Sequence, residues 1–532
     1  MKLPSMKYAD GIGKVKQIKF GGLARSLGAG DGEIWDMQNM TSDHHPLLSS
    51  RRGRWKKGEL VSPGGIFSWD GLCWVDGTTF YFDGAEKGTV SEGKKVFASM
   101  GAYVLIFPDK AYYNVDTGEF GSMEASWSGK GVVFSDGTLY GEAATANCIS
   151  CEGVRWEDYF RSGDAVTITG CTVEANNVSL IIRQIDGDKL YFYENSFQLG
   201  TEEGEVQLRR KVPDLKYLCE NENRLWGCTD NTIYACKLGD IFNWEVYDGL
   251  DTDAYSVDTG SAGPFTGCIS YRGYPTFFKE DHIYKVYGSV PSNFEVLGSA
   301  TLGLMDGCAG SLAVAGETLF YLSRSGMMAY TGGIPQPVNE AFGTERFYDA
   351  VAGSDGLKFY VSMKGGQGRY RLYVFDTQAG TWHIEDDIRI THFARADGEL
   401  YMLSDDGTLW AVGLTDAPEG ATVEDAVEWY VEFADFTEED PNKKGVSKLQ
   451  IRLELEQGAE AQAWLMFDSD GEWIRAGHAL GQEAKRSYYL PIVPRRADHY
   501  RLKITGTGAC RIHSIAREVY SGSELRSRSG RN

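Results

Sequence analysis

The chain has 532 residues, of which 42% are hydrophobic and 24% are charged. This composition excludes a collagen-like, coiled-coil or wholly disordered chain, and at roughly 100–200 residues per domain the length suggests three domains, give or take one. The formal net charge is −22, divided as +6 over residues 1–57, −34 over 58–442 and +6 over 443–532. An acidic body repels nucleic acid over most of its surface, so we expect no sequence-specific binding of nucleic acid.

Residues 1–57 are predicted to form an N-terminal arm. The arm lacks the apolar core of a signal peptide, and no stretch of the chain approaches the ~20 apolar residues of a membrane span. We therefore expect synthesis in the cytoplasm and no membrane span. Residues 33–40 are expected to form one or two helical turns, and a basic run follows from Arg51 to Lys57. The arm either lies on its own propeller, closing the ring with a strand, or reaches a neighbouring subunit.

A repeat runs through the middle of the chain. Gly273, Gly316, Gly356 and Gly398 lie 43, 40 and 42 residues apart, and each follows a turn and precedes an alternating aromatic strand and a second hairpin strand. Glycine supplies the positive φ that such turns need. Weaker copies lie upstream. A period of 40–50 residues with several short strands per unit is typical of β-propeller blades. We predict an all-β propeller of about seven blades, with six to eight possible.

The blades are predicted over residues 58–125 and 214–414. Between them, residues 126–213 contain strands and turns that break the repeat, and they are predicted to form an inserted small β-barrel or sandwich, since insertions in connections cost little. Residues 415–442 are interpreted as an acidic linker. Strong alternation over 443–520 predicts a C-terminal antiparallel β-sandwich, and the Ser/Arg/Gly-rich residues 521–532 a flexible tail.

Few residues suggest catalysis or metal binding. The ten cysteines are scattered, and Cys148-Ile-Ser-Cys151 is the only close pair, whereas a structural zinc site usually needs two such pairs. We expect buried thiols, no metal and no cofactor. Residues 404–410 loosely resemble the Asp-box turn of sialidases, but they are one residue short of it, and a hairpin explains them. No nucleophile elbow, P-loop, zinc-protease helix or dinucleotide loop is present, so we predict no catalytic residues and no enzyme.

Several phrases resemble bacteriophage tail and head–tail junction proteins with propeller folds. They are Gly21-Gly22-Leu23, the E-I-x-D-M-x-N-M phrase at residues 33–40 and the P-x-L-x-x-R phrase at residues 46–51. Residues 263–288 and 488–509 are similar to prophage-encoded proteins of Gram-positive bacteria. The resemblance covers most of the chain, as phrases. It implies a structural virion protein, such as the tail accessory or hub proteins of short-tailed phages, which form symmetric rings below the portal and hold the DNA in.

The resemblance would explain the two basic ends, which could dock on acidic surfaces of the portal, of adaptor or tail proteins, or of neighbouring copies. Alternatively, the positive charge of the two ends is incidental and has no role in docking. The candidate assembly contacts are Gly21, Gly22, Leu23, Asn39, Met40, Arg51, Arg52, Arg54, Arg495, Arg496 and Arg501. Two alternatives stay open: a propeller module that binds a host-surface glycan or receptor, with exposed aromatics at one mouth of the ring, and a glycan-degrading enzyme.

Overall fold

The computed structural model describes residues 12–26, 28–137, 145–194, 196–439, 443–482, 486–493 and 495–521. Within these ranges the regular elements are β-strands and five 3-10 turns, with no α-helix. The chain divides into two compact units, Val61–Ala309 and Met1–Leu60 with Gly310–Asn532. We call them the first and the second unit.

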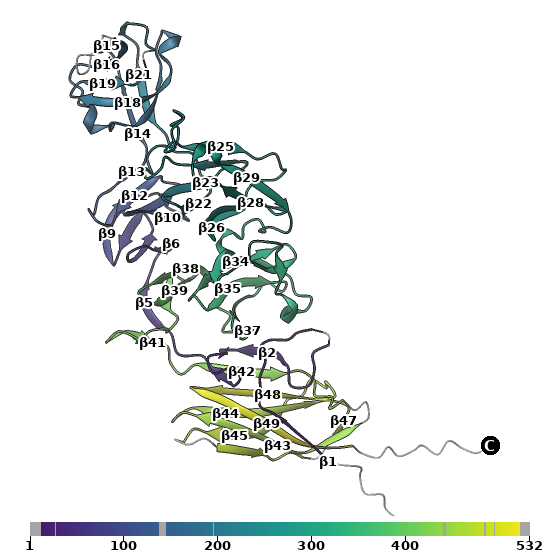
Figure 1. The fold of residues 1–532 in the computed structure, drawn as a ribbon. Coiled ribbons are helices and arrows are strands. Elements are labelled where there is room, and N and C mark those ends of the chain that lie inside the picture. Colours follow the sequence, from purple (N-terminus) through teal and green to yellow (C-terminus); the bar gives the residue numbers. More distant parts are fainter. Residues whose placement is uncertain are drawn as a thin grey trace, which may run out of the picture. The chain divides into compact units, whose positions relative to one another are not determined.

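Four four-stranded antiparallel sheets, each formed by consecutive strands, make up most of the first unit (Figure 1). We call them blades 1 to 4. Blade 1 is β6 (Pro63–Ser68), β7 (Leu72–Asp76), β8 (Thr79–Phe82) and β9 (Ala85–Thr89); blade 2 is β10 (Val96–Met100), β11 (Tyr103–Phe107), β12 (Ala111–Asn114) and β13 (Phe120–Ser122). Blade 3 is β22 (Tyr217–Asn221), β23 (Arg224–Cys228), β24 (Thr232–Ala235) and β25 (Tyr255–Asp258); blade 4 is β26 (Gly267–Tyr271), β27 (Tyr274–Phe278), β28 (His282–Tyr287) and β29 (Glu295–Ala300).

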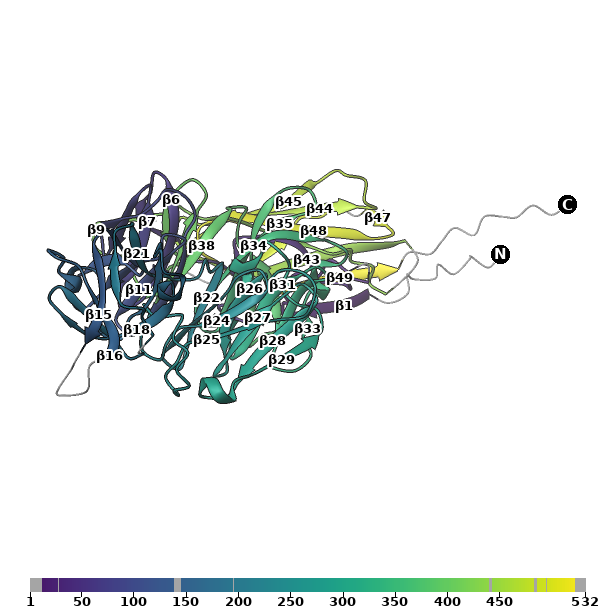
Figure 2. The ribbon, with the colours of Figure 1, turned by 90° about the horizontal axis from the view of Figure 1, so that it is seen from above.

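Tight turns explain why these segments form hairpins. In blade 4, Tyr271 pairs with Tyr274, so the loop between β26 and β27 is only Arg272 and Gly273. Both residues have positive φ, 52° and 78°, which is the backbone geometry that two-residue hairpins favour. The four strands of blade 4 lie side by side in both views (Figures 1 and 2). The glycine repeat therefore marks the first turn of a blade.

Aromatic and aliphatic side chains fill the space between neighbouring blades. One buried cluster joins blades 1 and 2 through residues such as Phe80 and Tyr113. A second joins blades 2 and 3, where Trp244 is 1% exposed, and a third joins blades 3 and 4 around Trp226 and Phe277. A four-stranded sheet has two faces to cover, and these clusters show that each blade covers the face of the next.

An eight-stranded sheet is inserted between blades 2 and 3, with its own core around Trp127, Trp156 and Phe160. Its strands, in sheet order, are β14 (Ala125–Gly129), β21 (Val206–Arg210), β17 (Ala165–Thr169), β18 (Ser179–Asp186), β19 (Lys189–Phe192), β16 (Thr145–Ser150), β15 (Val132–Gly137) and β20 (Gly200–Glu202). The 3-10 turns are η1 (Trp156–Asp158) and η2 (Glu174–Asn176) here, and η3 (Pro291–Asn293), η4 (Ala309–Ser311) and η5 (Glu340–Phe342) elsewhere.

The second unit contains three more blade sheets. Blade 5 is β30 (Ala313–Ala315), β31 (Thr318–Ser323), β32 (Gly326–Tyr330) and β33 (Gln336–Pro337); blade 6 is β34 (Phe347–Ser354), β35 (Lys358–Gly365), β36 (Tyr370–Asp376) and β37 (Thr381–Ile384). Blade 7 is β38 (Ile390–Ala396), β39 (Glu399–Ser404), β40 (Thr408–Ala411), β5 (Trp55–Glu59) and the short β41 (Thr422–Val423). The fourth strand of blade 7 is β5, which precedes all other blade strands in the sequence and pairs antiparallel with β40. The described residues thus form seven blade sheets, and the predicted all-β propeller class is confirmed.

The remaining strands form a β-sandwich, also as predicted. One sheet is β3 (Met40–Thr41), β4 (Leu48–Ser50), β49 (Cys510–Ser521), β43 (Lys444–Leu455) and β46 (Arg486–Leu490), with β1 (Ile12–Gln17) on β49 and β47 (Arg496–Ala497) on β43. The other is β2 (Ile34–Gln38), β42 (Glu428–Phe433), β48 (Tyr500–Thr507), β44 (Glu460–Phe467) and β45 (Ile474–Leu480). Alternate residues of β44 are buried, so one face of each strand points into the core.

Three details differ from the sequence predictions. Residues 12–50 are not a separate arm, since β1, β2 and β4 are paired strands of the sandwich. Residues 34–38 form strand β2 rather than helical turns. The predicted linker 415–442 contains β41 and β42, and β42 pairs with both β2 and β48. The physical reason is the same each time: a strand is stabilised by partners far away in sequence, which local patterns do not reveal. Of the predicted tail, residues 522–532 lie outside the described residues.

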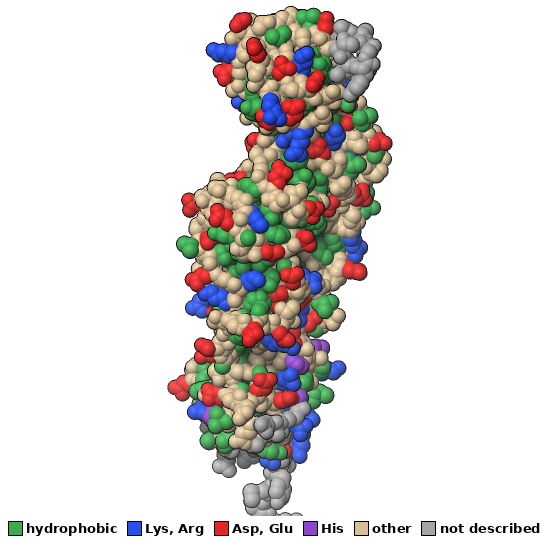
Figure 3. Space-filling view, turned by 90° about the vertical axis from the view of Figure 1, so that its left-hand side faces the viewer, with side chains coloured by type: hydrophobic (Ala, Val, Ile, Leu, Met, Phe, Trp, Pro, Cys, Tyr) green, Lys and Arg blue, Asp and Glu red, His purple; other side chains and the backbone are tan. Residues whose placement is uncertain are grey.

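All ten cysteines are free, and eight of them are buried. No helix among the described residues is long and apolar enough to cross a membrane. Acidic and basic side chains are interspersed over the face that Figure 3 shows, although acidic residues outnumber basic ones in the chain, 75 to 53.

Candidate functional site

Asp36 lies where the N-terminal segment meets both blade 6 and the sandwich. It belongs to β2, and Tyr430 of the neighbouring β42 donates a hydrogen bond from Oη to Asp36 Oδ2 at 2.8 Å. Arg371 of blade 6 donates from Nη1 to Asp36 Oδ1 at 2.8 Å, and Arg25 forms an ion pair with the same oxygen. Burial alone raises the pKa of Asp36, but the two guanidinium groups and the phenol outweigh it and hold this pKa below its usual value. Asp36 therefore stays charged and links three parts of the second unit.

Gly22 allows the N-terminal segment to lie directly on blade 6. A Cβ atom on Gly22 would be 2.3 Å from the carbonyl oxygen of Trp382 and 2.8 Å from Cβ of Thr381. Leu23, the next residue, donates its N–H to the Trp382 carbonyl oxygen at 2.7 Å, and its side chain is buried. Gly21 has no such neighbour within 4 Å. Only the second glycine of the pair is therefore required by packing.

A buried ionic cluster fixes the segment that leads into β5. Arg54 is fully buried, donates from Nη2 to Glu385 Oε2 at 2.6 Å and forms a second ion pair with Asp386. Arg51 donates from Nη1 to Glu424 Oε2 at 2.6 Å, and the backbone N–H of Arg54 donates to the same oxygen at 2.9 Å. Burial would raise the pKa of Glu424, but Arg51 and Arg54 lower it below its usual value. Both guanidinium groups are thus occupied inside the chain.

Asn39 and Met40 are also internal. Asn39 has a φ of 55° between β2 and β3, a backbone conformation that asparagine tolerates better than most residues. Its Nδ2 donates to the carbonyl oxygen of Glu428 at 2.7 Å, and its Oδ1 accepts from Arg51 Nε at 2.7 Å. Met40 has no exposed surface. Both residues hold the N-terminal segment in place and present little to a neighbouring protein.

The basic residues of the C-terminal half differ from one another. Arg501 is engaged inside the chain: its Nε donates to Asp435 Oδ1 at 2.6 Å, and its guanidinium lies over the Trp35 ring, 5.3 Å from the ring centroid. Arg495 is 45% exposed at its side chain and pairs with Asp470 at 3.1 Å, and Arg496 is exposed.

The structure therefore divides the eleven predicted contacts into two groups. The exposed ones are Gly21, Arg52, Arg495 and Arg496. The buried or half-buried ones are Gly22, Leu23, Asn39, Met40, Arg51, Arg54 and Arg501. Sequence reasoning missed the acidic partners Glu385, Asp386 and Glu424, although the run Glu385-Asp386-Asp387 directly after a strand was a visible signal for a charged junction.

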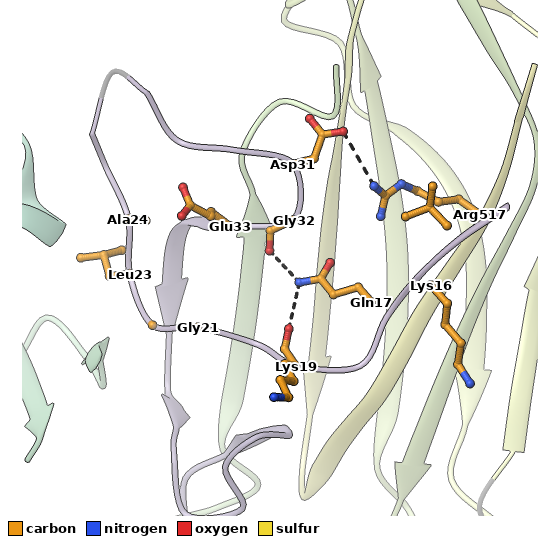
Figure 4. A pocket seen from close by; sticks show the side chains of 12 residues that line it. Lys16, Gln17, Lys19, Gly21, Leu23, Ala24, Asp31, Gly32, Glu33 and Arg517 are labelled. Atoms are coloured by element: carbon orange, nitrogen blue, oxygen red, sulfur yellow. Dashed lines mark hydrogen bonds and ion pairs between the residues drawn. The ribbon is translucent and has the colours of Figure 1, made fainter. Parts of the chain in front are cut away.

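Two hollows flank the turn at residues 21–24. The first, of about 500 Å³, lies behind β1 and is lined by Val15, Lys16, Gln17, Asp31 and Arg517 among others (Figure 4). The second, of about 930 Å³, lies between residues 22–35 and the edges of blades 5 and 6, where Trp35, Phe375 and Trp382 line it. Residues 22–24 line both hollows, so open space lies on two sides of this turn.

Among the described residues, no group of three or more His, Cys, Asp or Glu is placed to hold a metal ion. Burial raises the pKa of both Cys148 and Cys151, so these thiols are less easily ionised than exposed ones.

No protein-family model matches the chain, and no curated protein matches it. Among solved structures it is similar to an exo-β-1,3-galactanase from Phanerochaete chrysosporium, at 9% identity over 56% of this chain and 94% of that one, with a TM-score of 0.22. It is also similar to BamB from Moraxella catarrhalis, at 9% identity over 71% and 96% with a TM-score of 0.27. A third is Raptor from Chaetomium thermophilum, at 11% identity over 58% and 28% with a TM-score of 0.27. Likenesses at these TM-scores carry no argument about activity, and the propeller class rests on the seven blade sheets.

Proposed function

We propose that this chain is a structural protein of a bacteriophage particle, a tail hub or head–tail adaptor whose copies form a symmetric ring. The proposal begins with the resemblance of residues 21–23, 33–40 and 46–51 to phage proteins with propeller folds. The observation that carries the proposal is a set of contacts made by residues of these phrases. Gly22, Asp36 and Asn39 attach the N-terminal segment to both blade 6 and the sandwich. This role requires no catalytic reaction.

Such fastening suits a protein that transmits load. Segments far apart in the sequence are paired in one sheet, since β4 lies on β49 and β5 completes blade 7. Force applied to the sandwich is then carried by ladders of hydrogen bonds and not by a single linker.

The exposed basic residues are the proposed docking groups. Arg52, Arg495 and Arg496 remain at the surface, in the two terminal regions that each carry a net charge of +6. The middle region of the chain carries −34, so another copy, or an acidic portal, adaptor or tail protein, offers a complementary field. Complementary charges mainly raise association rates and are weakened by salt.

The glycan-binding alternative needs exposed aromatic side chains gathered at one place. The exposed aromatic side chains of the described residues are Trp69, Tyr159, Tyr193, Tyr247, Tyr274, Tyr348 and Tyr489. They come from four different blades, the inserted domain and the sandwich, and this dispersal gives no support to a sugar platform.

Sedimentation of the purified full-length chain at low and high salt tests the proposal. We expect a single closed oligomer at micromolar concentration, weakened by the double charge reversal Arg495→Glu with Arg496→Glu. The matched control is Lys130→Glu, an exposed charge reversal in the inserted domain, which should leave the oligomer intact. A chain that stays monomeric at every concentration, alone and with the other proteins of its particle, would contradict the proposal.

A further inference from the structure

Strand β1 is attached to the sandwich almost entirely by its backbone. It pairs antiparallel with β49 over six residues, from Ile12 opposite Tyr520 to Gln17 opposite Ile515 (Figure 2). The described side chains of β1, those of residues 14–17, bury little, since that of Lys14 is 75% exposed and Val15 is 40% exposed. The strand therefore contributes hydrogen bonds to the sheet but few apolar contacts to the core.

Among the described residues, few side chains hold β1. Lys14 Nζ lies 3.4 Å from Glu518 Oε1, an exposed ion pair of the kind that contributes little. Gln17 Nε2 donates to the carbonyl oxygen of Gly32 at 2.8 Å, as Figure 4 shows. Gln17 Oε1 is buried and finds no hydrogen-bond partner among the described residues, which is unfavourable. The hollow of about 500 Å³ described above lies directly behind the strand.

Firm attachment begins only at Phe20. This side chain is 2% exposed, its ring lies 6.2 Å from that of Phe433, and its N–H donates to the carbonyl oxygen of Pro46 at 3.0 Å. Ile18 and Lys19, between Phe20 and β1, are both exposed. These two residues can change conformation without disturbing the core, so they form a hinge between a loosely held strand and a fixed anchor.

We propose that β1 exchanges between copies, so that β1 of one copy pairs with residues 515–520 of β49 in the next. The inference rests on the proposed function, because it needs copies to be neighbours in a ring. Exchange costs little, since the same six-residue ladder is remade with an identical β49, and only the hinge changes. If every copy donates its β1 to the next copy in the same direction, the copies form a closed ring, and residues 515–520 of every β49 remain paired.

Cysteine cross-linking in the full chain tests the exchange. Lys16 lies opposite Ala516 in the ladder, so chains carrying Lys16→Cys and chains carrying Ala516→Cys are co-expressed with different tags and mildly oxidised. We expect a disulfide-linked pair containing one chain of each kind. Lys130→Cys with Ala516→Cys is the matched control and should give no such pair.

The double variant Lys16→Cys with Ala516→Cys separates the remaining outcomes. Oligomers in which only intramolecular disulfides form would refute the exchange while leaving the ring intact. Monomers at all concentrations, alone and with the other proteins of the particle, would refute the exchange and the proposed ring together. Cross-linked chains of the two single variants, found in oligomers but absent from dilute monomers, support both.

Discussion

Arg54 and Asp386 form an ion pair in which the guanidinium has no exposed surface. Arg54 directly precedes β5, the strand that completes blade 7, and Asp386 follows β37, the last strand of blade 6. Glu385, whose side chain is 6% exposed, is the second partner of Arg54. Burial would lower the pKa of Arg54, but these carboxylates raise it above its usual value, so the buried guanidinium stays protonated.

Replacing Arg54 by Met should be strongly destabilising, by about 3–5 kcal/mol, because two buried carboxylates would lose their cation. Denaturant unfolding of the full chain measures the effect in the transition of the second unit. Arg52→Met, two residues earlier and exposed, is the control and should change stability by less than about 0.5 kcal/mol. Equal effects of the two substitutions would show that the cluster does not hold β5.

Gly22→Ala should destabilise the second unit by about 1–3 kcal/mol, because the new Cβ would meet the Trp382 carbonyl oxygen at 2.3 Å. Gly21→Ala is the matched control, since nothing lies within 4 Å of its Cβ position. Thermal unfolding compares the two variants. Equal decreases in melting temperature for the two variants would contradict the close contact between Gly22 and blade 6.

Tyr430→Phe should weaken the junction around Asp36 by about 1–3 kcal/mol, because a hydrogen bond to a buried carboxylate is lost. Tyr489→Phe removes a hydroxyl from a side chain that is 67% exposed and should be neutral. Hydrogen exchange of the β2 and β42 amides reports where the loosening occurs. Unchanged exchange in β2 would contradict the linking role of Asp36.

Acidification should destabilise the second unit through His383. Burial lowers the pKa of His383 from 6.5 to about 4, and the positive charge of Lys358 contributes a smaller decrease. The carboxylates of Asp376 and Asp43 act in the opposite direction but do not compensate. Between these two values the unfolded chain holds a proton that the folded chain does not, so stability falls as the pH drops from about 6.5 to about 4. The full loss is about 3 kcal/mol. His383→Gln should flatten the stability profile in this range, and an unchanged slope would exclude His383 as its source.

Local features of the fold were predictable from the sequence, and long-range pairings were not. The hairpin at Arg272-Gly273 was predictable because Gly273 supplies a positive φ without steric cost. Residues 33–40 were misleading, because the buried residues Ile34, Met37 and Met40 have the spacing of a helix. A β-bulge between Ile34 and Asp36 and the positive φ of Asn39 produce that spacing in strands.

The candidate site shows the same limit. Charge patterning identified Arg51 and Arg54 as a basic run, but it could not show that Glu385 and Glu424, more than 300 positions away, neutralise them. Pairing across such distances depends on how β5 joins blade 7, which no local pattern encodes. Exposed Arg495 and Arg496 were predicted as docking groups, and that role stays a prediction.

Image reconstruction of an intact phage particle that contains this chain tests the central claim most directly. The account predicts a symmetric ring of this chain at the tail or the head–tail junction, with seven-bladed propellers and with Arg52, Arg495 and Arg496 against neighbouring proteins. Isolated copies outside the tail axis, for instance on fibres, or absence of the chain from the particle would contradict it.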